Sequence, residues 1–424
     1  MNSVEQQFET GLDYALKMDE KDPLKAFRNE FLFPKHTDGT EILYFCGNSL
    51  GLQPKSTRKM IEQELDDWAE HGVEGHFRAK KPWMPYHEFF TEKLAKIVGA
   101  NLNEIVVMNT LTVNLHLMMV SFYRPNGKRR KIVIEAAAFP SDKYAVASQL
   151  RFHGYSKEDL IQLSPRPGEE TLRMEDIESV LMSNSAEIAL IMLGGVNYYT
   201  GQFFDLKRIT QLGHKIGAKV GFDLAHAAGN VPLKLHEWNI DFAVWCHYKY
   251  LNSGPGAIAG AFVHEKHLEN PEIPRFEGWW GHDKNVRFLM EDNFVPMPSA
   301  ESWQLSNAPV FSMTPLLASL ELFDAAGFEK LRSKSIQLTA YMEFLLDQIN
   351  TDRIRIITPR DKHQRGCQLS IQVIGGNKNL YDQLTALGII ADWREPDVIR
   401  VAPVPLYNSY QDVYSFVERL STLI

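Results

Sequence analysis

The region from residue 104 to residue 264 most limits how this chain can fold, because short apolar runs alternate there with helix-like segments. The apolar runs predict strands over 104–108, 131–135, 187–193, 219–223, 242–246 and 260–264. Helices are expected between them, opening near residues 109, 139 and 205. Short continuous apolar strands that alternate with helices predict a mainly parallel sheet covered by helices on both faces.

The segments on either side of this region have a different pattern. Residues 1–50 mix prolines with apolar side chains at roughly helical spacing, which predicts an N-terminal arm. Residues 56–71 and 89–98 predict helices, and a long helical stretch is expected over 312–350. Strands at 353–357, 368–373 and 398–401 with a helix near 380–387 predict a smaller α+β domain. We therefore expect an arm (1–50), a large domain (51–310) and a small C-terminal domain (311–424).

Composition and charge exclude several classes of protein. The formal net charge of −8 argues against nucleic acid as the main partner, because phosphate binding favours a basic face. No apolar run approaches the length of a membrane span, and Met1–Glu9 lacks the features of a signal peptide, so a cytoplasmic protein is predicted. The three cysteines lie far apart without metal-ligand spacing, so neither a metal nor a disulfide is expected, and Cys246 is predicted to be a buried, inert thiol.

Polar side chains follow several of the predicted strands. Thr112, Asp142, Asp223 and Lys249 all lie at or just after a strand end. In open α/β sheets, ligands bind beyond the carboxyl ends of the strands. The sequence therefore predicts that these residues share one site.

Lys249 and Asp223 together indicate a cofactor. Lys249 follows an apolar strand and precedes a loop of small residues, which suits a buried lysine that forms a Schiff base, although a surface lysine after a strand fits as well. Asp223 closes a buried strand and needs a partner such as a protonated pyridine nitrogen, unless it only caps a helix. The two lie 26 residues apart (249 − 223), about one crossover connection. As a pair they indicate pyridoxal 5'-phosphate (PLP).

Other residues could complete such a site. Leu111 and Thr112 at a helix start, with Tyr248, could bind a phosphate, although Thr112 also fits a plain helix cap. Phe139 could stack on a planar ring. Arg400 lies between apolar residues and needs an anion, which could be a substrate carboxylate or an internal partner. Neither a P-loop nor a dinucleotide-binding motif is present.

Several blocks of the sequence, spread over nearly its full length, resemble the kynureninase family. They are Phe45-Cys-Gly-Asn-Ser-Leu-Gly-Leu52, Gly75-His76, Lys81-Pro-Trp83, Asn109-Thr-Leu-Thr112, Phe139-Pro-Ser-Asp142, Tyr198-Tyr-Thr-Gly-Gln202, Gly221-Phe-Asp-Leu-Ala-His-Ala227, Tyr248-Lys-Tyr-Leu251, Gly278-Trp-Trp-Gly-His282, Leu305-Ser-Asn307 and Arg400-Val-Ala-Pro-Val-Pro-Leu-Tyr-Asn408. The resemblance implies PLP fold type I, related to class V aminotransferases. That fold has a large domain with a mainly parallel seven-stranded sheet and a smaller α+β domain.

The resemblance also implies roles for individual residues. Lys249 would be the catalytic Schiff-base lysine, and we add the hypothesis that Tyr248 is the catalytic acid that protonates Cβ. The cofactor would be bound by Leu111, Thr112, Phe139, Pro140, Ser141, Asp142, Gly194, Asp223, His226, Tyr248, Lys249, Trp279 and Asn307. Trp279 and Asn307 would come from the partner subunit of a homodimer. The substrate would be bound by Ser49, His76, Ser306, Asn307 and Arg400. Gly194 departs from the family pattern, which often has a hydroxyl residue there, so only a backbone contact is expected from it.

The implied reaction is hydrolysis of the Cβ–Cγ bond of kynurenine or 3-hydroxykynurenine. Its products would be anthranilate or 3-hydroxyanthranilate and L-alanine, in tryptophan catabolism and NAD biosynthesis. His76, Ser306 and Asn307 resemble the branch of the family that prefers 3-hydroxykynurenine. Polar groups that pair with a ring hydroxyl discriminate well, because they lose their partner when the hydroxyl is absent.

Two alternatives remain open at this point. The first is another PLP enzyme of the same fold, a desulfurase or β-eliminating enzyme with a reactive cysteine on a mobile loop. Cys367 follows Gln364-Arg-Gly366 and could be exposed, although its surroundings do not resemble such a loop. The second is a binding or scaffold protein of this fold without catalysis, which the presence of Lys249, Asp223 and Arg400 argues against.

Overall fold

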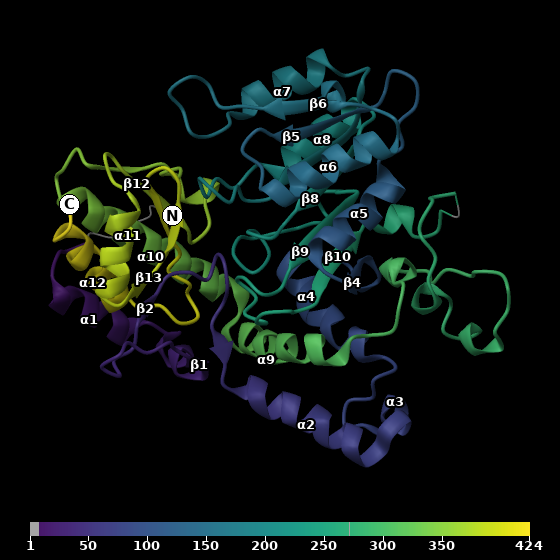
Figure 1. The fold of residues 1–424 in the computed structure, drawn as a ribbon, viewed down its shortest axis with the longest axis horizontal. Coiled ribbons are helices and arrows are strands. Elements are labelled where there is room, and N and C mark those ends of the chain that lie inside the picture. The colour runs from purple at the N-terminus through teal and green to yellow at the C-terminus, as the bar shows by residue number, and fades with distance from the viewer. Residues whose placement is uncertain (1–7, 271) are drawn as a thin grey trace, which may run out of the picture.

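A computed structural model describes residues 8–270 and 272–424 (Figure 1). The expectation that the chain lacks a signal peptide concerns its first residues, and 1–7 lie outside the described residues. No helix within the described ranges is long and apolar enough to cross a membrane.

A seven-stranded sheet forms the centre of the larger domain. Its strands, in spatial order, are β4 (Ile105–Val107), β10 (Ala259–Val263), β9 (Phe242–Cys246), β8 (Lys219–Asp223), β7 (Ile188–Gly194), β5 (Lys131–Glu135) and β6 (Leu160–Leu163). The run from β9 to β6 is parallel, and β10 is antiparallel to both of its neighbours. This confirms the mainly parallel sheet. The strand pattern missed β6, because that edge strand is short and only its last residue is buried.

Helices cover both faces of this sheet. One face packs against α5 (Leu111–Phe122) and α6 (Pro140–Phe152). The other packs against α4 (Thr91–Val98), α7 (Met174–Ser183), α8 (Leu206–Lys215) and α9 (Val310–Ala326). Successive side chains of a strand point to opposite faces, so Ile132 and Ile134 join the first core and Val133 joins the second. Because both faces are covered, the strands are apolar throughout rather than alternating.

The smaller domain combines helices with an antiparallel sheet. The sheet has the order β11 (Ile354–Ile356), β12 (Leu369–Val373), β15 (Val398–Val401) and β14 (Asp392–Arg394). It packs against α10 (Phe328–Gln348), α11 (Lys378–Ala386) and α12 (Tyr410–Ser421). The predicted single helical stretch over 312–350 is in fact two helices, α9 and α10. Gly327 separates them with a φ of 79°, which favours glycine.

The N-terminal segment packs against the smaller domain. Ala15 of α1 (Leu12–Lys21) and Phe45 belong to the same hydrophobic core as α10 and α12. The strand β2 (Leu43–Tyr44) pairs in parallel with β13 (Ile389–Ile390). Figure 1 accordingly shows both ends of the described chain at the left, in the same domain. The domain boundaries at residues 50/51 and 310/311 stay predictions.

The segment between these parts leads back to the sheet. The strand β1 (Phe31–Leu32) pairs with β3 (Gln53–Pro54), and α2 (Ser56–His71) then runs beside α9 toward α3 (Gly75–Arg78). Gly51 packs directly on the loop that carries Lys249, and its N–H donates to the Tyr248 carbonyl at 2.8 Å. A Cβ at Gly51 would collide with the carbonyl oxygen of Lys249, so only glycine fits there.

Candidate active site

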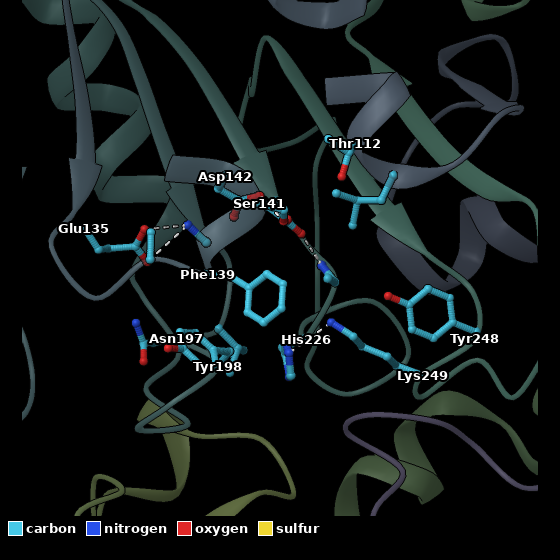
Figure 2. Close-up of a pocket in the computed structure, with 16 residues that line it drawn as sticks. Thr112, Glu135, Phe139, Ser141, Asp142, Asn197, Tyr198, His226, Tyr248 and Lys249 are labelled. Carbon is cyan, nitrogen blue, oxygen red and sulfur yellow. Dashed lines mark hydrogen bonds between the residues drawn. The ribbon is translucent and has the colours of Figure 1, made fainter. Parts of the chain in front are cut away.

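A pocket lies at the carboxyl ends of the parallel strands (Figure 2). It brings together ten of the predicted residues: Leu111, Thr112, Phe139, Ser141, Asp142, Gly194, Asp223, His226, Tyr248 and Lys249. It is also lined by six residues that were not predicted as site residues, namely Glu135, Ala138, Val196, Asn197, Tyr198 and Ala225. Glu135 ends a strand, as Asp223 does, so the same signal could have identified it.

Two helix N-termini contribute to the wall of the pocket. The helix α5 begins at Leu111, just after Asn109 turns the chain with a φ of 50°. The helix α6 begins at Pro140, where a missing N–H costs nothing, and Asp142 lies in its first turn. Free backbone N–H groups and the helix dipole favour an anion at such ends. The pocket thus has two places suited to a phosphate group.

Lys249 and His226 point toward each other inside the pocket (Figure 2). Their Nζ and Nε2 atoms lie 3.1 Å apart, and His226 is buried. Burial, and then the positive charge of Lys249, lower the pKa of His226 well below its usual range. The imidazole is therefore neutral and accepts the lysine hydrogen bond through Nε2. Its Nδ1 has no hydrogen-bond partner among the described residues.

Asp223 and Asp142 form a pair of buried carboxyl groups. Burial raises the pKa of both, and the negative charge of Asp223 raises that of Asp142 further. Asp142 therefore keeps a proton and donates a hydrogen bond to Asp223, while the positive charge of Lys249 favours the ionised form of Asp223. Asp223 also accepts from the backbone N–H of Ala225 at 2.7 Å. The floor of the pocket thus holds a carboxylate that can pair with a protonated ring nitrogen.

Glu135 adds a third buried carboxyl group. Both of its oxygens accept from the Gly194 N–H at 3.2 Å. Burial raises the pKa of Glu135 to about 7. A Cβ at residue 194 would lie 3.1 Å from the glutamate Oε1, which is a tight contact. The glycine that departs from the family pattern thus lets its backbone approach Glu135 closely, and its predicted contact with the cofactor stays a prediction.

Arg400 and Ser49 lie together beside the pocket. The Arg400 guanidinium is 1% exposed and donates to the Tyr198 carbonyl and to the Asp392 carboxylate, and Ser49 donates to the same carboxylate. Tyr198 lines the pocket, and its ring lies 5.7 Å from the Arg400 Cζ. Arg400 therefore has an internal partner and still borders the site.

The remaining predicted residues do not line this pocket. Pro140 is exposed at the start of α6, and His76 lies in α3 with its Nδ1 2.9 Å from the Val73 carbonyl oxygen. Ser306 and Asn307 are exposed. Trp279 is 46% exposed in a 3-10 turn (Trp279–Gly281). Within one chain these residues remain apart from Lys249.

Two predictions about cysteines have different outcomes. Cys246 is buried, as expected. The expectation that Cys367 could be exposed is wrong, because this residue is 1% exposed and its N–H donates to the Asn230 side chain at 2.9 Å. Burial raises the pKa of the Cys367 thiol to about 12. A reactive thiolate is therefore not available at this position.

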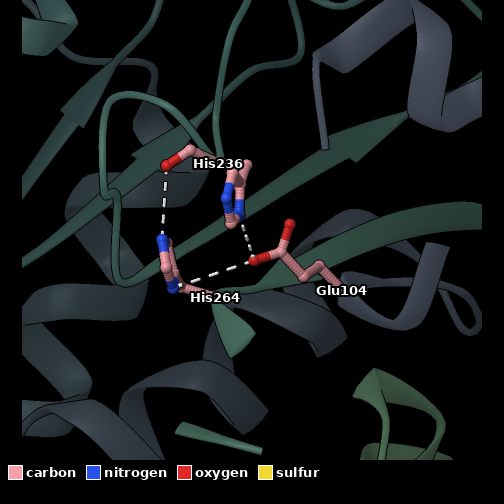
Figure 3. Close-up of side chains that lie close together, drawn as sticks. All are labelled: Glu104, His236 and His264. Carbon is pink, nitrogen blue, oxygen red and sulfur yellow. Dashed lines mark hydrogen bonds and ion pairs between the residues drawn. The ribbon is translucent and has the colours of Figure 1, made fainter. Parts of the chain in front are cut away.

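Glu104, His236 and His264 converge away from the pocket and could suggest a metal centre (Figure 3). The two imidazole rings are stacked at 5.0 Å with only 15° between their planes. A histidine nitrogen binds a metal within its ring plane, so one ion cannot satisfy both rings in this arrangement. His236 instead lies 2.9 Å from Glu104, and His264 binds the His236 carbonyl and the Lys266 N–H. We interpret the cluster as a hydrogen-bond network.

Comparison with known proteins assigns the fold and the family separately. The chain is 57% identical over 413 residues to a kynureninase of Koribacter versatilis, with 97% of each protein covered. It is 57% identical over 414 residues to a kynureninase of Myxococcus xanthus, again with 97% of each covered. The chain belongs to the kynureninase family. Residues 331–420 also match the family model of the kynureninase C-terminal domain.

Solved structures confirm the fold of this chain. A cysteine desulfurase of Escherichia coli aligns with a TM-score of 0.76 at 19% identity, covering 94% of this chain and 98% of that one. A cystine C–S lyase bound to cysteine persulfide aligns with a TM-score of 0.77 at 17% identity, covering 90% and 97%. At such identity the likeness extends to the fold alone. The activity follows from the family: hydrolytic cleavage of kynurenine, in tryptophan catabolism, with PLP as cofactor.

The pocket fits PLP by its donors and charges. Asp223 offers a carboxylate for a protonated ring nitrogen, and the N-terminus of α5 offers backbone N–H groups for a phosphate. Asp223 is a buried carboxyl group in this pocket, so a positively charged ring nitrogen would give it a partner. The Lys249 Nζ lies 5.8 Å from the centre of the Phe139 ring, which is 43% exposed and available for stacking.

The buried state of Glu135 makes the stability of the cofactor-free protein depend on pH. The pKa of Glu135 is raised in the folded protein, so its stabilising contribution is complete below about pH 4.5 and is lost as pH rises through about 7. A rise from 4.5 to about 7 corresponds to about 3 kcal/mol. We expect Glu135→Gln to gain stability relative to the parent protein between pH 5 and 8, measured by urea unfolding.

The matched control for that measurement is Glu158→Gln, which replaces an exposed glutamate. This variant should show the same change in the free energy of unfolding between pH 5 and pH 8 as the parent protein. An equal pH dependence of unfolding in the parent and Glu135→Gln proteins would contradict the buried, protonated state of Glu135.

Proposed function

We propose that Lys249 is the residue that PLP modifies covalently and that the surrounding pocket holds the cofactor. The supporting observation is the position of the Lys249 Nζ, 3.1 Å from a neutral histidine and in the same pocket as the buried Asp223. A lysine amine that lies in a pocket beside a hydrogen-bond acceptor is placed to form a Schiff base with a cofactor aldehyde. Asp223 would bind the ring nitrogen, and Phe139 would stack on the ring.

The rest of the cofactor would be held by groups around the two helix N-termini. We propose that Leu111, Thr112 and Tyr248 bind the phosphate, with Ser141 and Asp142 closing the ring side of the pocket and Pro140 fixing the start of α6 that carries them. His226 would lie beside the ring. In this arrangement the bound cofactor supplies an electron sink for carbanionic chemistry next to the substrate.

The protein groups then bind substrate and move protons. Arg400 and Ser49 would bind the α-carboxylate of kynurenine. The amine of Lys249 would take the proton from Cα of the substrate. Burial raises the pKa of Tyr248, so its hydroxyl stays protonated at neutral pH and can donate to Cβ as the products, anthranilate or 3-hydroxyanthranilate and L-alanine, form.

Replacing Tyr248 and Lys249 one at a time separates their roles. Tyr248→Phe should lower kcat by about 100-fold or more, because a general acid contributes about that much. Its bound PLP should still absorb visible light and still be fixed to Lys249 by borohydride, as peptide mapping would check. Lys249→Ala is the matched variant and should lose both turnover and the borohydride-fixed peptide. Full turnover in Tyr248→Phe would contradict the acid role, and borohydride labelling of another lysine would contradict the role of Lys249.

We further propose that the enzyme is a homodimer with shared active sites. Large apolar side chains are exposed on α2 and α3 and on the segment after β10, namely Trp68, Phe77, Phe276, Trp279, Phe288, Leu289 and Met290. Figure 1 shows the segment after β10 projecting at the right of the molecule. Exposed apolar groups in such number favour burial against a partner. Trp279, His76, Ser306 and Asn307 would then reach the pocket of the other subunit.

Subunit mixing tests the shared site. Lys249→Ala and Trp279→Ala should each be nearly inactive alone. A mixed dimer of the two would contain one intact site, so random reassembly should restore about a quarter of the parent activity. Lys249→Ala mixed with Tyr248→Phe is the control, because both changes then affect the subunit's own site and no intact site can form. Failure of the first mixture to recover, with mixed dimers confirmed by tagging, would contradict the shared site.

The specificity that we propose is a preference for 3-hydroxykynurenine, set by His76, Ser306 and Asn307. The ratio of kcat/KM for 3-hydroxykynurenine over kynurenine should exceed about 10, because unpaired polar groups penalise the substrate that lacks the hydroxyl. Release of 3-hydroxyanthranilate and of anthranilate by the purified enzyme, with added PLP, measures both values. An equal or reversed ratio would contradict the assignment. The cytoplasmic location and the link to NAD biosynthesis stay predictions.

A further inference from the structure

Arg400 belongs to a cluster of charged side chains that extends beyond the predicted substrate-binding residues. Asp392 and Arg400 face each other across the antiparallel strands β14 and β15. The Oδ2 atom of Asp392 accepts hydrogen bonds from Arg400, from Ser49 and from Arg394, the last at 3.1 Å. The Asp392 side chain is 11% exposed and that of Arg400 is 1% exposed. A single carboxylate thus fixes two of the groups expected to bind substrate.

This cluster has unused capacity to bind an anion. Two guanidinium groups and one carboxylate give it a formal charge of +1 (+2 − 1). The Nε atoms of Arg394 and Arg400 are both buried and lack a hydrogen-bond partner among the described residues. A buried N–H group without an acceptor is destabilising, and more so when the group is charged. One further carboxylate would balance the charge and supply an acceptor.

The cluster lies within reach of the proposed cofactor site. Arg400 donates to the carbonyl of Tyr198, which lines the pocket. After burial and Lys249, the positive charges of Arg400 and Arg394 both lower the pKa of His226. The two arginines are therefore close enough to act electrostatically on the residue that contacts Lys249.

We propose that Asp392 is a positioning residue and Arg394 a second cation for the α-carboxylate of the substrate. Asp392 holds the Arg400 guanidinium and the Ser49 hydroxyl in place, and Arg394 keeps Asp392 paired when the substrate enters. The complete set is then two guanidinium groups and two carboxylates, which is neutral. This inference rests on the proposed role of Arg400 in binding that carboxylate.

The main competing interpretation is that Asp392 occupies the place of the substrate. In that case removing its charge would free Arg400 and tighten the binding of amino acids. The unpartnered Nε of Arg400 argues for the positioning role, because Asp392 uses only Nη2 and leaves another donor of the guanidinium unpaired. The two interpretations thus predict opposite changes in affinity.

The test compares two ligands on the PLP-loaded enzyme. L-Alanine carries the α-carboxylate and L-alaninamide lacks it, and the binding of each is followed by the change in absorbance of the bound cofactor. Asp392→Asn should raise the Kd for L-alanine and the KM for kynurenine at least 10-fold, with kcat changed less than threefold. The Kd for L-alaninamide and the affinity for PLP should not change. Arg394→Gln should weaken L-alanine binding in the same selective way, and Asp392→Glu should restore part of the affinity.

Controls separate the possible outcomes. Asp382→Asn, an exposed change on α11 in the same domain, should leave every value unchanged. An equal weakening of L-alanine and L-alaninamide by Asp392→Asn would overturn the proposal in favour of a structural role, and tighter L-alanine binding would overturn it in favour of competition. Unchanged L-alanine binding would also overturn it. If Arg400→Gln also leaves L-alanine binding unchanged, the proposed role of Arg400 in binding the carboxylate is contradicted. If Arg400→Gln weakens L-alanine binding and Asp392→Asn does not, only the proposed role of Asp392 is contradicted.

Discussion

The burial of three carboxyl groups in one pocket is the constraint on which the site depends. Glu135, Asp142 and Asp223 meet at the carboxyl edge of the parallel sheet, where backbone geometry brings the ends of β5 and β8 together with the start of α6. Burial raises the pKa of all three, so protons are retained there that a solvated site would lose. A cofactor with a protonated ring nitrogen would give the buried Asp223 a charged partner, which would link the stability of the pocket to its loading.

The smaller domain supplies the other half of the chemistry. Arg400 and Asp392 lie on its antiparallel sheet, and Ser49 lies on the segment that enters it from the N-terminus. The Gly51 N–H to Tyr248 hydrogen bond fixes that segment against the lysine loop. The proposed carboxylate site is therefore assembled from two domains. A movement of the smaller domain would change the distance between Arg400 and Lys249 without disturbing the carboxyl groups of the larger one.

Prediction from sequence worked where a local pattern carried the information. The apolar runs identified six of the seven strands, because strands buried on both faces are continuously apolar. The edge strand β6 lacked that signal, since only its last residue is buried. Strand-end position identified Asp223 and Lys249 but not Glu135, although it also ends a strand. No spacing rule predicts the positions of Asn197, Tyr198 and Asp392. Their contacts with the site depend on segments that are distant in the sequence: Asn197 and Tyr198 share the pocket with Lys249, and Arg400 donates to the Tyr198 carbonyl.

The sequence by itself determined the fold class, the family, the cofactor and the identity of the Schiff-base lysine candidate, because each depends on residue type at a strand end or on long matching blocks. Only the tertiary structure decided how charge is balanced. Four features depend on which groups face each other in a medium of low polarity. They are the burial of Cys367, the neutral state of His226, the proton retained by Asp142, and the hydrogen bonds that Asp392 accepts from both Arg400 and Ser49. These contacts join residues that are far apart in the chain, so local sequence patterns do not predict them.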